Sequence, residues 1–189
     1  MRGVRTLLAA GCEPVVVVVG AAGAAVAAEL AADAAVSGRC QPVINDGWGS
    51  GVGSSLRAGL SALDGRCGAV AITLVDQPEL TAEAVRRVAD AWRRGAPAAV
   101  ATDAGEQAHP VVLDAALWRA VAANAVGERG ARTLLRAHPE LVIRVACDGA
   151  GSARDVDTAL ELHALARSIG ADVGVRNQGA RGAGTAHWN

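Results

Sequence analysis

The stretch Ala69-Val-Ala-Ile-Thr-Leu-Val-Asp76-Gln77-Pro78 decides the fold class predicted for this chain. It is a continuous apolar run of strand length, rich in β-branched residues, which is typical of a parallel strand covered by helices on both faces. Pro78 has no N–H to donate to a strand ladder, so we expect the strand to stop there with Asp76 at its carboxyl end. Ligands bind at such strand ends in open α/β sheets, but turns also favour Asp for reasons of their own. Asp76 is therefore open to two interpretations, a ligand site and a turn residue.

The rest of the sequence alternates short apolar runs with helical periodicity. The pattern predicts further strands at residues 15–19, 42–45, 98–102, 111–113 and 141–146. It predicts helices at residues 3–10, 21–36, 56–63, 82–94, 114–124, 129–137 and from 157 or 158 to 169, with His109-Pro110 in a turn. Strands that alternate with helices indicate a three-layer α/β/α domain with a mostly parallel sheet. We expect this domain to span residues 1–169, followed by a flexible Gly- and Ala-rich tail at 170–189.

Composition and charge exclude several classes of function. The formal net charge is −1, every basic residue apart from histidine is Arg, and the only aromatic side chains besides histidine are four Trp. Bulk attraction to a polyanion and base stacking on aromatic platforms are therefore not expected, which argues against nucleic acid as a partner. The apolar run at 15–28 is too short to span a bilayer, and the apolar stretch before Cys12 is too short for a lipoprotein signal. We expect a cytoplasmic protein without membrane contact, whose four scattered cysteines are reduced.

A glycine-rich loop, Gly49-Ser-Gly-Val-Gly53-Ser54-Ser55-Leu-Arg-Ala-Gly59, follows the strand that ends at Asn45. Its glycines let the backbone approach a ligand closely, and its serines lie at the expected start of a helix. Such a position suits a nucleobase edge or an anionic oxygen. The alternative is a surface loop in which a serine only caps the helix.

Two more segments carry candidate binding groups. Arg129 and Arg132 lie in a glycine-made turn at a helix start, where an arginine can hold a phosphate or simply be a solvated helix charge. Asp155 and Asp157 lie at a later junction between loop and helix. One of these carboxylates could join Asp76 around Mg²⁺, or Asp157 could serve as the helix N-cap.

A dinucleotide-binding interpretation rests on Val19-Gly20-Ala-Ala-Gly23, a strand that runs into a glycine turn and a helix. The G-x-G spacing is missing, and Asn45 stands at the strand end where an acidic residue would bind a ribose. We therefore rank NAD(P) binding below the other possibilities.

The order of these motifs resembles the MobA-like NTP transferase family, and most closely its molybdenum cofactor cytidylyltransferase branch. The resemblance covers residues from about Arg5 to His163 and rests on six motifs in sequence. They are Asn45 after a strand, Gly-x-Gly-Ser-Ser-Leu-Arg-x-Gly-Leu, Asp76-Gln-Pro, His109-Pro-Val, Gly127-x-Arg-Gly-Ala-Arg132 and Asp155-Val-Asp-Thr158.

The resemblance implies a Rossmann-like, GT-A-like nucleotidyltransferase fold and Mg²⁺-dependent transfer of a nucleoside monophosphate, with pyrophosphate as the leaving group. The NTP would be CTP and the acceptor a phosphorylated molecule such as the molybdopterin cofactor, with a molybdoenzyme or its chaperone as a protein partner. By this resemblance Asp76 and Asp155 would be the catalytic metal ligands. Asn45, Gly53, Ser54 and Ser55 would lie along the base. His109, Arg129 and Arg132 would lie toward the acceptor.

One departure from the family pattern concerns the phosphate-binding loop. The family begins with a strand and a loop of the form L-A-A-G-x-x-x-R-x-G-x-P-K, whereas here Leu8-Ala-Ala-Gly11 is followed by Cys-Glu-Pro and five valines. The first strand and this loop are therefore expected to be absent from the sequence. Two hypotheses follow: the natural start lies upstream, or the chain is an inactive relative that binds a nucleotide or a partner. In either case we expect little NTP turnover from these 189 residues.

Overall fold

The computed structural model describes residues 1–63, 65, 67–151 and 158. The chain divides into two compact units, Met1–Asp155 and Val156–Asn189, and the fold given below is that of the first unit. Asp155, Asp157, the predicted last helix and the predicted tail lie outside the described residues. The domain boundary at residue 169 therefore stays a prediction.

Helices and strands alternate along the described part of the first unit. The strands are β1 (Val15–Val19), β2 (Cys40–Ile44), β3 (Ala69–Ile72), β4 (Ala98–Asp103), β5 (Glu106–Asp114) and β6 (Val142–Ala146). The helices are α1 (Arg2–Ala9), α2 (Gly23–Ala32), α3 (Val52–Ala62), α4 (Ala82–Arg93), α5 (Trp118–Asn124) and α6 (Ala131–Ala137). Short 3₁₀ turns are η1 (Trp48–Ser50), η2 (Ala115–Leu117) and η3 (Pro139–Leu141).

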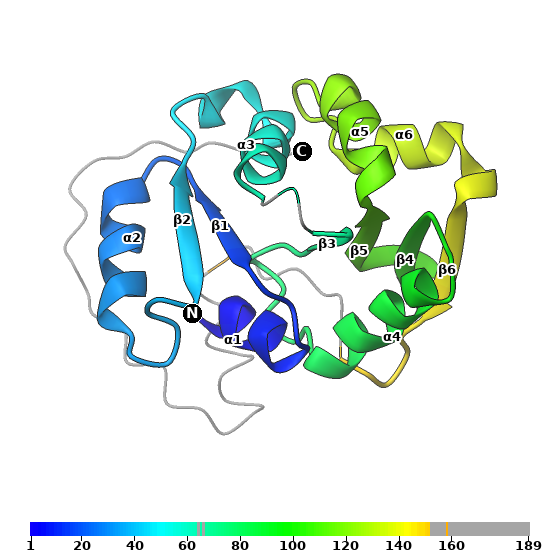
Figure 1. Cartoon of the computed structure of the whole chain (residues 1–189), viewed down its shortest axis with the longest axis horizontal. Helices are drawn as coiled ribbons and strands as arrows, with labels where there is room; N and C mark the ends of the chain where they lie inside the picture. Colours follow the sequence, from blue (N-terminus) through cyan, green and yellow to red (C-terminus); the bar gives the residue numbers. More distant parts are fainter. Residues whose placement is uncertain (64, 66, 152–157, 159–189) are drawn as a thin grey trace. The chain divides into compact units, whose positions relative to one another are not determined.

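The strands form two sheets that lie side by side (Figure 1). β1 pairs with β2 in parallel, and the second sheet has the order β3-β5-β4-β6. In that sheet β6 runs parallel to β4, whereas β5 runs antiparallel to both β3 and β4. Within the described residues no strand ladder joins β1 to β3.

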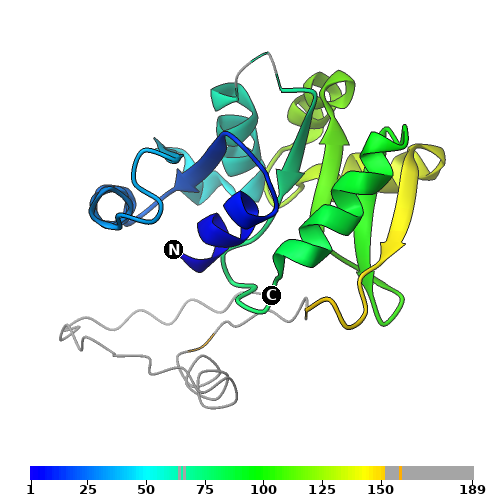
Figure 2. The same cartoon turned by 60° about the horizontal axis from the view of Figure 1, so that its bottom comes forward.

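Helices cover both faces of the four-stranded sheet (Figures 1 and 2). α4 packs on one face, where Val85 and Val88 are fully buried in a cluster with Val112. α3, α5 and α6 contribute to a second cluster on the other face, around the fully buried Leu113 and Val121. These layers confirm the predicted α/β/α fold class. The core consists largely of Ala, Val and Leu, as the composition requires.

Thr81 caps α4 as predicted, because its hydroxyl accepts a bond from the Ala84 N–H at 3.3 Å. The four cysteines, Cys12, Cys40, Cys67 and Cys147, are free thiols. In the described part of the chain, no helix combines the length and apolarity needed to cross a bilayer.

The β3 strand is shorter than its apolar run predicts. It ends at Ile72, and Asp76 lies in a turn four residues later rather than at the strand end itself. β5 is the neighbour that pairs with β3 in the described residues, and this pairing stops at Ile72–Val111. Among the described residues, 73–75 therefore join no strand ladder, and Val75 is 92% exposed.

The predicted turn at His109-Pro110 is wrong, since both residues lie within β5. Proline is tolerated there because the β4–β5 register shifts between Val100 and Thr102, so Pro110 faces no ladder position that needs its N–H. The helix predicted from residue 56 begins earlier, at Val52, and the helix predicted to residue 36 ends at Ala32.

Candidate functional site

Asp76 is the half-buried carboxylate that follows β3. The next residue, Gln77, is buried, and the turn continues through Pro78 to the buried Leu80, which anchors it in the core under α4. The backbone on both sides of Asp76 is therefore fixed by packing. Asp76 is thus a turn residue that lies four residues beyond the carboxyl end of β3, and its role as a ligand stays a prediction.

Asn45 holds the glycine-rich loop through its side-chain amide. It follows β2, is 8% exposed, and its own N–H donates to Val19 O at 2.8 Å. Asn45 Nδ2 donates to Ser54 Oγ at 2.8 Å and to Ser55 Oγ at 3.1 Å. Asn45 Oδ1 accepts from the Gly47 N–H at 3.1 Å. One buried side chain thus joins the end of β2, the loop and the start of α3.

Ser54 and Ser55 differ in what their hydroxyls do. Ser54 Oγ lies 3.0 Å from Gly47 O and 2.9 Å from Gly51 O, so its single proton is shared between two backbone carbonyls. Ser54 is 7% exposed and serves to hold the loop. Ser55 is half-buried and accepts from Asn45, and in the described residues its hydroxyl donates no bond. Of the two serines, Ser55 is the one whose hydroxyl proton has no acceptor among the described residues.

The glycine-rich loop packs directly against residues 125–128. Gly53 N–H donates to Gly127 O at 2.9 Å. A Cβ at Gly51 would lie 2.5 Å from Gly127 O, and one at Gly53 would lie 2.6 Å from Ala125 C. The Arg57 guanidinium also donates to Ala125 O, so this arginine supports the junction. Two motifs that are far apart in the sequence are therefore brought together here.

Arg129 and Arg132 follow that junction along the chain. Arg129 is exposed, and its N–H donates to Val126 O at 3.0 Å. Arg132, in the first turn of α6, is exposed and lines a groove of about 440 Å³ together with residues of β5 and β6. Two other arginines of this groove, Arg136 and Arg144, were not singled out from the sequence. The signal that could have found Arg136 is the 132/136 spacing, which places both side chains on one face of a helix. No such local signal points to Arg144.

His109 lies in a different place from the arginine groove. It lines a small pocket with Leu80, Thr102 and Cys147, beside the cluster under α4. Burial raises the pKa of the Cys147 thiol there, so the thiol stays protonated. The structure thus brings Asn45, Gly53, Ser54 and Ser55 together. Gly53 packs against residues 125–128, which precede Arg129 in the chain. The structure does not place His109 in the groove with Arg132.

A metal ion would find one suitable carboxylate in the described part of the site. Asp76 supplies the hard oxygen donors that Mg²⁺ prefers, and Mg²⁺ is often held by one or two carboxylates with water and phosphate oxygens completing its shell. The described residues contain no group of three His, Cys, Asp or Glu that could hold a metal. Asp76 could therefore supply one oxygen ligand of a divalent ion, and within the described residues it belongs to no cluster of three such groups.

Comparison with known proteins places this geometry in a family. The MobA-like NTP transferase domain matches residues 1–142. Nicotine blue oxidoreductase of Paenarthrobacter nicotinovorans is 35% identical over 170 residues, which cover 85% of this chain and 79% of that protein.

Solved structures with the same fold include Rv0371c from Mycobacterium tuberculosis H37Rv. Its TM-score is 0.72 at 24% identity, over 88% of this chain and 82% of that one. The same protein has been crystallised in complex with manganese. A nucleotidyl transferase from Methanothermobacter thermautotroptrophicus has a TM-score of 0.69 at 17% identity, over 89% of this chain and 78% of that one.

The resemblance inferred from the motifs is thus confirmed by a match over most of the described residues. The substrate class of this family is a nucleoside triphosphate. The chain belongs to the MobA-like NTP transferase family of nucleotidyltransferase enzymes.

Proposed function

We propose that this chain acts in the transfer of CMP from CTP to a phosphorylated acceptor such as the molybdopterin cofactor, with release of pyrophosphate. The main support for the proposal is the structure of the glycine-rich loop. The Asn45 amide donates hydrogen bonds to Ser54 and Ser55 of this loop, and Gly51 and Gly53 pack closely against residues 125–127. A rigid, glycine-lined wall at a helix start suits a flat nucleobase, because its backbone can approach the ring closely.

In this proposal the loop residues have distinct roles. Asn45 and Ser54 hold the wall in shape, since their polar groups are bonded within the loop. Ser55 is the hydroxyl that contacts the nucleotide, because it is half-buried and keeps its proton. Gly53 lies along the base.

Asp76 is proposed as the Mg²⁺ ligand, with Asp155 as the second carboxylate. The manganese complex of Rv0371c supports a divalent ion in this fold, but it does not identify the ion for this chain. When bound, Mg²⁺ would neutralise phosphate charge, which is the main catalytic requirement of phosphoryl transfer. Arg129, Arg132 and His109 are proposed to lie toward the acceptor, and a molybdoenzyme or its chaperone is proposed as the receiver of the product.

The sequence contains neither the R-x-G-x-P-K motif nor any lysine. We therefore expect slow turnover from these 189 residues, and a non-catalytic nucleotide-binding role is the alternative within the same family. Binding is the property that both versions share, so the test must measure binding first.

The experiment is thermal denaturation of the chain with CTP, GTP, ATP and NADH, each with and without Mg²⁺. We expect CTP with Mg²⁺ to stabilise the chain by about 2.7 kcal/mol at a hundredfold excess over Kd. Asp76→Asn should remove the Mg²⁺-dependent part, and Ser55→Ala should weaken CTP binding with or without the metal. Glu29→Gln, an exposed substitution on α2, is the matched control. Equal responses to all nucleotides would contradict the proposal, and so would a response unchanged in Asp76→Asn.

An oxidoreductase function is the second candidate, because nicotine blue oxidoreductase is 35% identical over 85% of this chain. The turn after β1 argues against a dinucleotide there. A Cβ at Gly20 would lie 2.8 Å from the Trp48 Cβ, so the Trp48 side chain already occupies the close approach that a pyrophosphate would need. Stabilisation of the chain by NADH rather than by CTP would favour this candidate over nucleotidyl transfer.

A further inference from the structure

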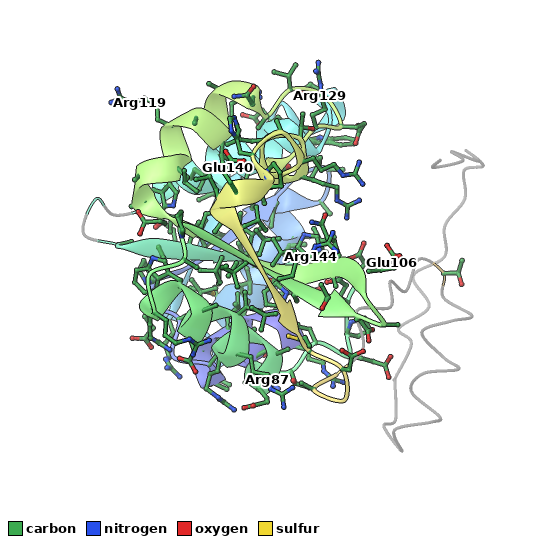
Figure 3. All side chains as sticks on the ribbon, turned by 90° about the vertical axis from the view of Figure 1, so that its right-hand side faces the viewer. Arg87, Glu106, Arg119, Arg129, Glu140 and Arg144 are labelled. Carbon is green, nitrogen blue, oxygen red and sulfur yellow. The ribbon has the colours of Figure 1, made fainter. Side chains whose placement is uncertain are left out.

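An open groove on the α6 face of the sheet gathers three arginines. Its volume is about 440 Å³, and its polar lining consists of Arg132 and Arg136 on α6, Arg144 on β6, and Glu106 and Gln107 on β5. Figure 3 shows Arg144 and Glu106 on the same side of the molecule. The three arginines come from α6 and β6, which follow one another along the chain and are joined by the short turn η3.

The fold explains why these side chains meet. Arg132 and Arg136 are four residues apart in α6, so they project from one face of the helix. Leu135 of α6 packs in the same cluster as Val142 of β6. Because side chains alternate along a strand, Arg144 lies on the same face as Val142, beneath α6.

These arginines lack the carboxylate partners found elsewhere on the surface. Arg5 pairs with Asp33 at 2.6 Å, Arg39 with Glu13 at 2.9 Å, and Arg93 with Asp90 at 2.6 Å. Across the residues the structure describes, none of the three groove arginines forms an ion pair.

Glu106 offsets one of the three positive charges, which leaves the groove with a formal excess of two. The whole chain carries a net charge of −1, so this excess is local and not a consequence of a basic protein. Like charges four residues apart in a helix are mildly destabilising, by about 0.2–0.5 kcal/mol, and a bound anion would relieve this repulsion.

The groove lies at the functional edge of the sheet. β5 runs antiparallel to β3, so Glu106 and Gln107, at its start, lie toward the edge where the chain leaves β3 for Asp76. β6 runs parallel to β4, and Arg144 is opposite Val100, two residues before their shared carboxyl edge at Thr102–Ala146.

We propose that this groove binds a dianionic phosphate group, and that Arg136 and Arg144 are binding residues beside Arg132. Arginine is suited to this ligand because its planar guanidinium donates two parallel bonds to phosphate oxygens. The chain has no lysine to do so instead. The phosphate could belong to the acceptor or to the pyrophosphate end of the NTP. That choice rests on the proposed function, whereas phosphate binding itself does not.

The first experiment uses inorganic phosphate and pyrophosphate as probes in isothermal titration of the 189-residue chain at fixed ionic strength. Arg136→Gln and Arg144→Gln should each weaken pyrophosphate binding roughly tenfold, since each removes a charge-assisted contact. Arg119→Gln, an exposed arginine on α5, should leave it unchanged. The three substituted residues, Arg119, Arg136 and Arg144, are all exposed, so circular dichroism should show that each variant is folded. An absence of pyrophosphate binding, or an equal loss in Arg119→Gln, would overturn the proposal.

The second experiment identifies the source of the phosphate. If the groove holds the end of the NTP, the double variant Arg136→Gln/Arg144→Gln should bind CTP with Mg²⁺ at least tenfold more weakly than the parent. If it holds the acceptor, CTP affinity should stay unchanged while affinity for a phosphorylated acceptor falls. If the chain bound pyrophosphate but not CTP, the phosphate-binding groove would be supported and the proposed function refuted. If it bound CTP but not pyrophosphate, the proposed function would be supported and the phosphate-binding groove refuted.

Discussion

Substitution of Asn45 by Ala tests the central element of the candidate site. The change removes the two bonds that Asn45 Nδ2 donates to Ser54 Oγ and Ser55 Oγ and the bond that Oδ1 accepts from the Gly47 N–H. Asn45 and Ser54 are both buried, so water replaces these bonds poorly. The loop would then be held by the Ser54 hydroxyl and by the contacts of its glycines.

The expected cost follows from the number and burial of the bonds lost. A typical intramolecular hydrogen bond contributes about 0.5–1.5 kcal/mol, and a buried polar group left without a partner costs about 1–3 kcal/mol. The three bonds share one side chain and are not additive, so we expect a loss of about 2–4 kcal/mol. In a chain of this size that corresponds to a fall in Tm of roughly 5–15 °C.

The assay is urea denaturation followed by circular dichroism, with Asn124→Ala as the matched control. Asn124 is exposed, and its side chain donates one bond to Ala120 O at 2.8 Å, so its loss should cost less than about 0.5 kcal/mol. Asn45→Ala should also weaken CTP binding, because the wall along the base loses its shape. If Asn45→Ala proved no more destabilising than Asn124→Ala, the view of Asn45 as the holder of the loop would be refuted.

Three further predictions concern other parts of the described unit. Gly51→Ala should destabilise the chain by about 3 kcal/mol, because φ is 102° at Gly51 and the new Cβ would lie 2.5 Å from Gly127 O. Gly127→Ala is the control: φ is 59° there and a new Cβ would meet open space, so a urea titration should show a loss of only about 1 kcal/mol. The Trp92 indole N–H and then the Ala116 N–H hold the pKa of Asp114 below its ordinary value of 3.8. The folding stability that the Asp114 carboxylate contributes is therefore present above pH 3.8 and is lost as pH falls through the lower pKa of the folded state. Urea midpoints measured from pH 6 to pH 2 should show that loss, and the Asp114→Asn variant should not show it. In hydrogen exchange, the amides of β4, paired on both sides, should exchange more slowly than those of β3, paired on one side in the described residues, and equal protection would contradict the topology.

The sequence predicted the elements whose signals are local. Five consecutive valines predicted β1 at its observed bounds, and Thr81 with Glu83 predicted the start of α4. The Asn45 and Gly-Ser-Ser motifs pointed to the loop, and the structure joins them directly. Periodicity and capping act over a few residues, so the sequence carries them in full.

Features that depend on distant contacts were not accessible in this way. Glycine usually indicates a loop, yet Gly53 lies in the first turn of α3, because Ala125 from a remote segment leaves no room for a side chain. Proline usually interrupts a strand, yet Pro110 is accommodated where the register with β4 shifts. The arginine groove also requires the packing of α6 on β6, which no local pattern encodes.

The position of Asp76 follows from the same dependence on neighbours. The apolar run continues from Ile72 to Val75 with strand-forming residues, but in the described part of the chain β3 has β5 as its single neighbour, and their pairing stops at Val111. Val75 is consequently 92% exposed, although its sequence context suits a buried strand. A strand between β1 and β3 would give residues 73–75 a ladder partner, bury Val75 and bring Asp76 to the strand end that the sequence predicts. Within the described residues, the difference between predicted and observed β3 therefore follows from the point where its pairing with β5 stops, and not from a misleading local sequence signal.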